Sequence, residues 1–312
     1  MRTELAPLKT NLCGVELASP IVLAAGTCGY VDEISVALDL GRIGAVTTKS
    51  ITPEPREGNR PMRVLDVKAG MINAVGLANM GVEAFMREKV PVIERTPTVV
   101  IGSIAGFSVE DYVTVASRFA TIDAMPIVEM NVSCPNCRDG RLATASTEIL
   151  SEHVRAVRAV LGDKKLFVKL PPSTDRLVSL AAAAVEAGAD GITMVNTLEV
   201  LSIDIRTRRS VLGRPRKGMS GPAIHHLAVR LVHDVYQGVT EEAGVPIIGL
   251  GGVLDWKDAA EMVLVGATAV GIGTGLFVDP ACPRRISKGL GRWVHSQGCD
   301  SLSQLVGAHE DT

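Results

Sequence analysis

The amino-acid sequence predicts an α/β fold in the form of a (β/α)8 TIM barrel. Eight short runs of β-branched and other apolar residues recur along the 312 residues, and amphipathic helical patterns separate them. No Pro/Ser-rich linker interrupts this alternation, so we expect residues 1–312 to form a single domain. Strands that alternate with helices form a parallel sheet, and eight such units in roughly 300 residues indicate a closed barrel. A doubly wound open sheet is the alternative, although it would not need eight regular repeats.

Each predicted strand is a short apolar run that ends where glycine, proline or small polar residues stop the pairing. The strands are residues 21–26, 44–50, 98–106, 126–133, 166–170, 191–197, 246–252 and 269–274. The helices predicted to follow them are residues 32–40, 81–95, 108–122, 146–162, 176–188, a segment that begins near Pro222, 255–266 and 282–297. The connections after strands 2, 4 and 6 are extended, and in a barrel all three open on the catalytic face.

The composition excludes several classes of protein. Hydrophobic residues make up 46% of the chain and charged residues 21%, which provides a large core and argues against disorder. Aromatic residues are only 3% and the formal net charge is −2, so we expect no nucleic-acid partner. No apolar run approaches the roughly 18 residues of a membrane-spanning helix, and residues 1–4 lack a signal-peptide core. Six scattered cysteines are too few for a disulfide scaffold, so we expect a cytoplasmic protein without membrane attachment.

The fourth predicted strand ends in the run Asn131-Val-Ser-Cys-Pro-Asn-Cys137, which places a thiol, a hydroxyl and carboxamides together. In parallel α/β proteins, the carboxyl ends of the strands carry the chemistry. A free cysteine is commonly an inert core residue. The proline after Cys134 instead indicates a loop, where a thiol can act as a nucleophile or general base. Cys134 and Cys137 form a C-x-x-C pair, but no second pair or suitably spaced histidines accompany it, so we expect no metal site.

Two lysines end apolar strands at the predicted barrel mouth, Lys49 on strand 2 and Lys169 on strand 5. A lysine commonly extends to solvent, but two of them at one face suggest that negative charge develops on a bound group, such as a reduced flavin. Strands 7 and 8 end in glycine-containing runs, Gly251-Gly252 and Gly273-Thr274-Gly275. A single loop of this kind is as readily a simple turn. Both together, where barrels commonly bind phosphate through backbone N–H groups, predict a phosphate site.

Two longer loops contain candidate binding residues whose roles the sequence leaves open. In residues 71–81, Asn73, Gly76 and Leu77 would offer a carboxamide and backbone N–H groups to a planar polar ligand, or would serve only as turn residues. The loop 206–217 carries six basic residues, which we interpret as a solvated loop, with a lid or subunit contact as the alternative. The histidines lie mainly on predicted helices away from the strand ends, and none is a convincing base.

Several motifs follow one another in a fixed order along the chain. They are Thr47-Thr-Lys-Ser50, Arg56-Glu-Gly-Asn59, Met71-Ile-Asn-Ala-Val-Gly-Leu77, Asn131-Val-Ser-Cys-Pro-Asn136, Val168-Lys-Leu-Pro171, Val195-Asn-Thr197, Ser220-Gly-Pro-Ala-Ile224, Gly251-Gly252 and Gly273-Thr274. In this order the chain resembles the dihydroorotate dehydrogenases, flavin enzymes of pyrimidine biosynthesis, along nearly its whole length. It is most similar to class 1, which has cysteine rather than serine as base and no membrane-binding N-terminal extension. Ile203-Asp-Ile-Arg-Thr-Arg208 and Gly81-Val-Glu-Ala-Phe85 are similar to the NAD-linked 1B catalytic subunit.

The resemblance implies that FMN lies across the barrel mouth and that dihydroorotate stacks on it. It implies flavin contacts from Ala25, Gly26, Lys49, Ser50, Asn131, Lys169, Val195 and Gly221, and a phosphate site at Gly251, Gly252, Gly273 and Thr274. It implies substrate contacts from Lys49, Asn73, Ala74, Val75, Gly76, Leu77, Asn131, Asn196 and Thr197. Cys134 would remove the C5 proton of dihydroorotate while C6 passes a hydride to flavin N5. Lys169 would balance the charge of the reduced flavin, so the implied catalytic residues are Cys134, Lys169 and Lys49.

A 1B enzyme works with a separate subunit that carries FAD and an iron–sulfur cluster, and this chain has no cysteine array for a cluster. The resemblance therefore implies such an electron-transfer subunit as a partner, dihydroorotate and orotate as ligands, and a homodimer or a heterotetramer as the assembly. The sequence leaves the electron acceptor open between NAD through the partner, fumarate and a quinone.

Three departures from the family pattern keep other functions open. Ala25 stands where a serine is usual, Ser103 stands where an asparagine is usual, and the loop after Cys134 differs from the usual glycine- and phenylalanine-containing sequence. They motivate the alternative of a related FMN oxidoreductase that acts on another pyrimidine or cyclic amide. Two further alternatives are a flavin-binding subunit without its own turnover and a flavin-free aldolase or synthase that uses Lys169.

Overall fold

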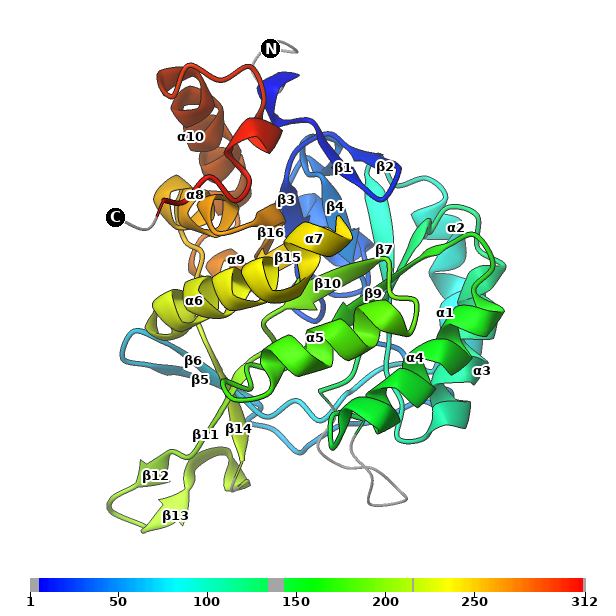
Figure 1. The fold of residues 1–312 in the computed structure, drawn as a ribbon. Coiled ribbons are helices and arrows are strands. Elements are labelled where there is room, and N and C mark those ends of the chain that lie inside the picture. The colour runs from blue at the N-terminus through cyan, green and yellow to red at the C-terminus, as the bar shows by residue number, and fades with distance from the viewer. Residues whose placement is uncertain (1–5, 134–142, 215, 311–312) are drawn as a thin grey trace.

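The computed structural model describes residues 6–133, 143–214 and 216–310. Its centre is a closed barrel of parallel strands, which confirms the predicted (β/α)8 architecture (Figure 1). The barrel strands are β3 (Ile21–Leu23), β4 (Ala45–Thr47), β7 (Val99–Ile104), β8 (Ile127–Asn131), β9 (Lys165–Lys169), β10 (Gly191–Met194), β15 (Ile247–Leu250) and β16 (Ala267–Ile272). They pair in chain order, and the barrel closes where β16 pairs with β3. All eight lie within the predicted strands or overlap them by most of their length.

Helices cover the outside of the barrel and follow the later strands as predicted. They are α3 (Val109–Ala120), α4 (Thr147–Val160), α5 (Leu177–Glu186), α6 (His225–Val235), α8 (Trp256–Leu264) and α10 (Cys282–Ser296). The side chains of Ser108, Ser146 and Asp255 accept hydrogen bonds from the first turns of α3, α4 and α8, which fixes where these helices begin. Shorter turns are η1 (Ala6–Leu8), η4 (Val211–Gly213), η5 (Pro222–Ile224), the π-helical η6 (Tyr236–Thr240), α7 (Glu241–Ala243), α9 (Gly275–Val278) and η7 (Leu302–Leu305).

The predicted helix over residues 32–40 is wrong, because the chain forms two short 3-10 turns there, η2 (Asp32–Val36) and η3 (Leu40–Arg42). Val36 is 92% exposed while Leu38 and Leu40 are buried. Buried residues two positions apart do not lie on one face of an α-helix. Asp39 between them is extended, and its side chain accepts a hydrogen bond from the N–H of Gly41.

The predicted helix over residues 81–95 is divided into α1 (Val82–Glu88) and α2 (Val90–Ile93). The division falls beside Pro91, which has no N–H to donate and whose ring disfavours an uninterrupted helix. The two halves together cover the segment that was expected to be helical.

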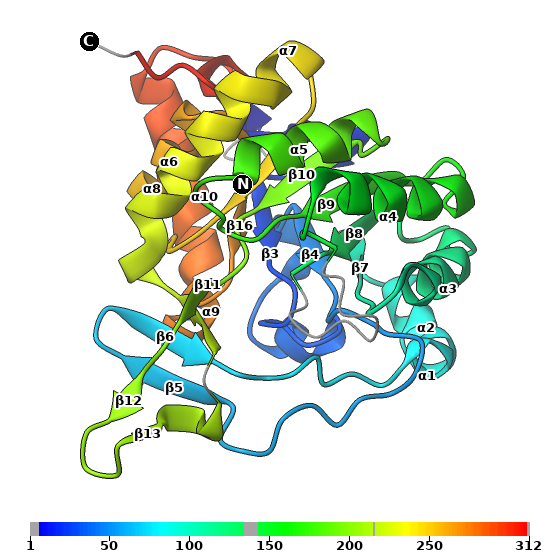
Figure 2. The ribbon, with the colours of Figure 1, turned by 60° about the horizontal axis from the view of Figure 1, so that its bottom comes forward.

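The extended connections after the second and sixth barrel strands pair with each other. They form the mouth sheet, an antiparallel sheet of β5 (Val64–Val67), β6 (Gly70–Asn73), β11 (Leu198–Val200) and β14 (Lys217–Ser220), in the order β11-β14-β6-β5. Figure 2 shows this sheet beside the open end of the barrel, with the small hairpin of β12 (Ile203–Asp204) and β13 (Arg209–Ser210) projecting from it. The predicted extended connection after the fourth strand contains residues 134–142, which lie outside the described residues.

The opposite end of the barrel is closed by an antiparallel hairpin of β1 (Thr10–Leu12) and β2 (Val15–Leu17). Leu12 and Leu17 are buried and pack with side chains that point into the barrel, among them Ile127 and Phe167. The sequence did not single out this hairpin, because each of its strands has only three residues. It separates the lower interior of the barrel from water.

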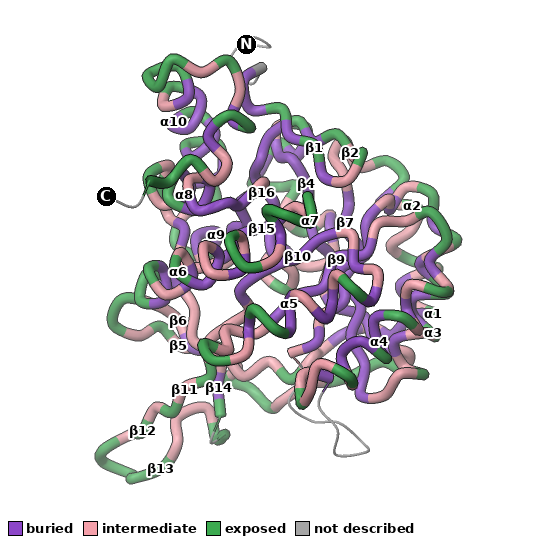
Figure 3. Tube along the Cα trace, in the orientation of Figure 1, coloured by how far each residue is buried: buried purple, intermediate pink, exposed green. Residues whose placement is uncertain are grey.

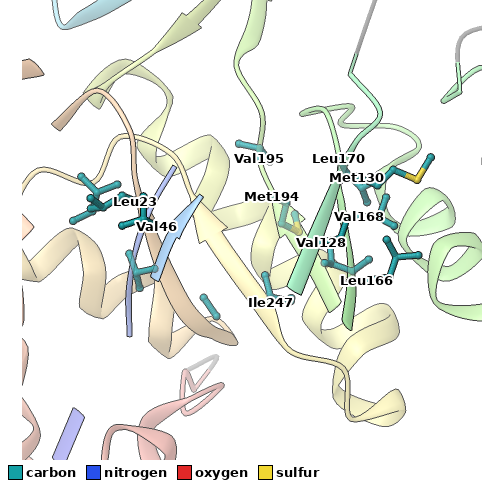
Figure 4. Packing of buried hydrophobic residues seen from close by; sticks show 14 of the residues in the cluster. Leu23, Val46, Val128, Met130, Leu166, Val168, Leu170, Met194, Val195 and Ile247 are labelled. Carbon is teal, nitrogen blue, oxygen red and sulfur yellow. The ribbon is translucent and has the colours of Figure 1, made fainter. Parts of the chain in front are cut away.

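The larger part of the core lies between the barrel and its helices. Figure 4 shows Val128, Met130, Leu166 and Val168 close together in this layer, on the side of β8 and β9 that faces the helices. Buried residues follow the barrel strands and the inner faces of the helices, whereas the β12–β13 hairpin is largely exposed (Figure 3). Among the described residues, no helix is both long and apolar enough to span a membrane.

Candidate functional site

A cavity of about 1070 Å³ opens at the carboxyl ends of the barrel strands, beside the mouth sheet. We call it the mouth cavity. It brings together every predicted flavin- and substrate-binding residue that the structure describes, from segments far apart in the chain. These lining residues are Ala25, Gly26, Lys49, Ser50, Asn73, Ala74, Val75, Gly76, Leu77, Asn131, Lys169, Val195, Asn196, Thr197, Gly221, Gly251, Gly252, Gly273 and Thr274. What each of them binds stays a prediction.

A hydrogen-bonded network of carboxamides and hydroxyls lies on one side of the mouth cavity. The Nδ2 of Asn131 donates to Ser50 Oγ at 3.3 Å, and the hydroxyls of Ser50 and Ser103 are 2.8 Å apart. The Oδ1 of Asn131 accepts from the Nδ2 of Asn196 at 3.2 Å and from the N–H of Ser133 at 3.2 Å. These bonds hold the Asn131 amide in one orientation. The network can therefore present fixed donors and acceptors to a planar ligand.

Two ammonium groups, that of the half-buried Lys49 and that of the buried Lys169, line the mouth cavity from different strands. Lys49 follows β4, and burial lowers its pKa, with a smaller contribution from the charge of Arg63. Lys169 ends β9 and is only 5% exposed. Its Nζ lies 3.7 Å from Oε1 of Glu129. Both cations are therefore held where water is scarce, and this strengthens their attraction for a negative charge.

The loops after β15 and β16 form a cradle of backbone N–H groups. Within the described part of the chain, the N–H groups of Gly252, Gly273 and Thr274 donate no hydrogen bond. Gly252 has a φ of +70°, and a Cβ there would lie 2.8 Å from the carbonyl oxygen of Gly221. Only glycine suits this conformation and this space. The cradle fits a phosphate group, which accepts hydrogen bonds from several N–H groups at once.

A histidine that the sequence gave no reason to place at a strand end supports this cradle. His225, the first residue of α6, has Nδ1 2.7 Å from the carbonyl oxygen of Gly251 and Nε2 2.9 Å from Oε2 of Glu261. Ligand atoms of His225, His226 and Glu261 lie within 4.8 Å of one another. Both ring nitrogens of His225 already have hydrogen-bond partners, so we interpret the histidine as an anchor for the Gly251 loop. Only its position three residues after the Gly221-Pro222 turn could have pointed to this role.

The basic loop 206–217 divides into an exposed part and a part that reaches the site. Its first basic residues belong to the projecting β12–β13 hairpin, as expected for a solvated loop. Arg214, Arg216 and Lys217 instead line the mouth cavity. Lys217 is buried, its Nζ donates to the carbonyl oxygen of Arg214 at 2.6 Å, and burial lowers its pKa. This lysine therefore fastens the loop to the mouth sheet.

Cys134, the predicted base, and Cys137 lie outside the described residues. Ser133, the last described residue before them, lines the mouth cavity. Its Oγ is buried and has no hydrogen-bond partner within the described part of the chain.

Comparison with known proteins adds a finding that is independent of this geometry. The sequence model of a family described as "Dihydroorotate dehydrogenase" matches residues 7–294. A relative from Bacteroides thetaiotaomicron, named as the catalytic subunit of dihydroorotate dehydrogenase B (NAD(+)), is 39% identical over 307 residues. That alignment covers 98% of this chain and 100% of the relative.

Two further relatives differ in the acceptor that their names give. A protein from Pelobacter propionicus with the same name is 39% identical over 303 residues, which cover 97% of this chain and 98% of the relative. A protein from Solibacter usitatus, provisionally named dihydroorotate dehydrogenase A (fumarate), is 39% identical over 300 residues, which cover 96% and 97%. Identity alone therefore does not separate the two types.

Proposed function

Because the chain belongs to the dihydroorotate dehydrogenase family, we propose that FMN and dihydroorotate bind together in the mouth cavity. The chain is an oxidoreductase that oxidises dihydroorotate to orotate in pyrimidine biosynthesis. The family is flavin-dependent, and FMN is the flavin that we propose. Family membership also argues against a flavin-free aldolase or synthase.

The observation that carries the proposal is the convergence of three kinds of group in one cavity. Free backbone N–H groups, two ammonium groups and a network of carboxamides all line the same space of about 1070 Å³. Pockets for single drug-sized ligands span roughly 300–1,000 Å³. The mouth cavity therefore has room for a flavin together with a small substrate.

The chain's residues fit an FMN phosphate at one end of the mouth cavity. The N–H groups of Gly252, Gly273 and Thr274 would hold the phosphate oxygens. The hydroxyl of Thr274 donates to Ser220 Oγ at 2.7 Å, which orients this loop toward the mouth sheet. His225 would hold the Gly251 loop in position through the contact of its Nδ1 with the carbonyl oxygen of Gly251. We propose that Ala25, Gly26, Ser50, Val195 and Gly221 contact the remainder of the cofactor.

The carboxamides suit a pyrimidine, which is a planar array of N–H and C=O groups. Asn131 and Asn196 are already oriented by their mutual hydrogen bond, and the Nδ2 of Asn73 donates to the carbonyl oxygen of Gly218 at 3.1 Å. Their remaining donors and acceptors would bind the substrate ring. Lys49 would bind its carboxylate, while residues 74–77 and Thr197 complete the enclosure.

Cys134 is the base that we propose, on its sequence position alone. It would take the C5 proton of dihydroorotate, and Lys169 would hold its positive charge beside the flavin. When bound, the flavin supplies a hydride acceptor for C6 of the substrate. The chain itself positions the substrate, excludes water and accepts the proton.

Anaerobic addition of dihydroorotate to the purified protein tests the function directly. We expect the flavin absorbance to bleach. A Cys134→Ser variant should be reduced at least about 10²-fold more slowly at neutral pH, because a serine hydroxyl is harder to deprotonate than a thiol.

The outcome that would overturn the proposal is a flavin that dihydroorotate does not bleach. Bleaching by another pyrimidine or cyclic amide in a substrate panel would favour the related oxidoreductase instead. A flavin that no pyrimidine reduces would favour a binding subunit without turnover. Unchanged reduction of the Cys134→Ser variant would remove Cys134 from the mechanism.

We propose that electrons leave through a partner subunit that carries FAD and an iron–sulfur cluster, and that the assembly is a homodimer or a heterotetramer. The names of the Bacteroides and Pelobacter relatives, which specify a catalytic subunit, support a partner. Titrating the reduced protein with NAD, fumarate and a quinone decides the acceptor. Rapid oxidation by fumarate without any partner would contradict this part of the proposal. A cytoplasmic location and a single domain over residues 1–312 stay predictions.

A further inference from the structure

Glu129 is a buried carboxylate to which the proposed function assigns no role. Its neighbours in β8, Val128 and Met130, pack outward with the layer beneath the helices (Figure 4). Side chains alternate across a strand, so Glu129 points to the barrel axis together with Ile127 below it and Asn131 above it. It is 3% exposed. A carboxylate buried to this extent needs a compensating partner.

The partner that the structure provides is Lys169. Oε1 of Glu129 lies 3.7 Å from Nζ of Lys169, and both side chains are almost completely buried. The separation is too long for a hydrogen bond. Within the described part of the chain, Oε1 has no hydrogen-bond partner at all. Oε1 of Glu129 is therefore stabilised by the charge of the lysine and not by a hydrogen bond.

The pair is placed so that one member reaches the proposed flavin and the other does not. Lys169 lines the mouth cavity, whereas Glu129 does not. Lys169 pairs with Asn131 on the neighbouring strand, and Glu129 lies two residues before Asn131, farther from the mouth. A ligand in the cavity would thus meet the ammonium first, with the carboxylate behind it. The two opposite charges bring the net charge at this position close to zero.

We propose that Glu129 is a positioning residue that offsets the charge of Lys169 and thereby sets how easily the bound flavin is reduced. The inference rests on the proposed function, since it requires a flavin above Lys169. A reduced flavin carries negative charge, so Lys169 favours reduction and Glu129 opposes it. With both charges present, the reduced flavin would remain able to transfer its electrons to the electron acceptor.

The first test is the reduction potential of four proteins with bound FMN, measured against a dye of known potential. Glu129→Gln keeps the shape and leaves a net positive charge. It should raise the ratio of reduced to oxidised flavin at a fixed potential about tenfold, or about 30 mV for a two-electron couple. Lys169→Met should shift this ratio in the opposite direction. The double variant, which again has no net charge at this position, should lie close to the wild type.

Thr193→Val is the matched control. Thr193 lies on β10 beside Lys169, is buried, and its Oγ1 also lacks a hydrogen-bond partner among the described residues. Its replacement changes polarity but no charge, so the potential should stay unchanged. If the reduction potential of FMN bound to Glu129→Gln were equal to or below that of the wild type, the proposal would be overturned. A shift of the reduction potential in Thr193→Val as large as that in Glu129→Gln would also overturn it, because the shift would then reflect altered packing and not charge.

The second test does not need a flavin and separates this inference from the proposed function. Thermal unfolding of the full chain without added flavin should show Glu129→Gln melting about 5–10 °C below the wild type, because it leaves Lys169 buried without a counter-charge. The double variant should recover most of this loss. Additive losses would show that the two side chains are not a pair and would overturn the inference. Absence of flavin binding in the wild type would instead contradict the proposed function.

Discussion

The lower and upper halves of the barrel interior are built from the same strands but from opposite kinds of side chain. On β8 the inward positions run from Ile127 through Glu129 to Asn131, and on β9 they run from Phe167 to Lys169. A step of two residues along either strand therefore leads from a sealed apolar end to a charged and hydrogen-bonding end. The lower end, closed by the β1–β2 hairpin, should affect stability alone, whereas the residues that line the mouth cavity should determine chemistry.

The difference follows from access to ligand and water. Leu12 and Leu17 fill the lower end, so polar groups there would be buried without partners. At the upper end the strands open into the mouth cavity, where charged groups can meet a ligand. A substitution at the lower end should therefore change stability, whereas a substitution of a residue that lines the mouth cavity should change binding or reaction.

The largest effect should come from the lower end. Phe167 is fully buried and fills the space beside Gly191 inside the barrel. Phe167→Ala should lower the free energy of unfolding by about 3–5 kcal/mol, because it leaves a cavity in the core. Chemical denaturation measures this, and Phe167→Leu should cost less. If Phe167→Ala instead slowed flavin reduction and left stability intact, the division between the two ends would be wrong.

At the upper end the expected effect is on the reaction. Lys49→Met retains the aliphatic stem and removes the ammonium group. We expect dihydroorotate to reduce the flavin about 10²–10³-fold more slowly in this variant, the loss typical of removing one positioned electrostatic contact. Anaerobic stopped-flow measurements of flavin absorbance test this.

The same variant should not be less stable than the wild type. Burial lowers the pKa of Lys49 below its unfolded value, so between these two pKa values the unfolded chain binds more protons. The wild type should therefore gain stability as pH rises through that window, and Lys49→Met should lack this gain. A marked loss of stability in Lys49→Met at neutral pH would contradict a purely functional role.

The thiol of Cys13 at the lower end and that of Cys134, the proposed base, should differ in reactivity. Cys13, in the β1–β2 turn, has Sγ 2.9 Å from the carbonyl oxygen of Asp190, and burial, aided by the charge of Asp190, raises its pKa to about 11. At pH 8 its thiolate should be on the order of 10²-fold rarer than that of an ordinary cysteine. Brief labelling of the native protein with iodoacetamide, followed by peptide mass spectrometry, should mark Cys134 long before Cys13. The reverse order would count against Cys134 as the base.

The smallest effect should come from the phosphate cradle. Gly252→Ala would force a side chain into a φ of +70° against the carbonyl oxygen of Gly221, and should weaken FMN binding about tenfold. Gly244→Ala is the control, since Gly244 has a φ of +65° but nothing within 4 Å of an added Cβ. It should affect stability alone. Equal affinities of both variants for FMN would show that the cradle does not hold the phosphate.

Local patterns predicted the barrel well but failed in the connections. Runs such as residues 166–170 have the apolar character of buried strands, and serines such as Ser108 mark helix starts. The expected helix over 32–40 was wrong because Leu38 and Leu40 are buried with strand-like spacing. The mouth sheet was not predicted, since β6 pairs with β14 across more than a hundred residues, and no local pattern encodes such a pairing.

The sequence by itself determined which chemistry stands at the barrel mouth. In a parallel barrel every strand ends on the same face, so Lys49, Asn131 and Lys169 had to meet there once the strands were recognised. Tertiary structure alone decided what holds these groups. The contact of His225 with Gly251 and the 3.7 Å pairing of Glu129 with Lys169 depend on distances between side chains of separate elements. Such distances follow from packing, which no motif or spacing in the chain specifies.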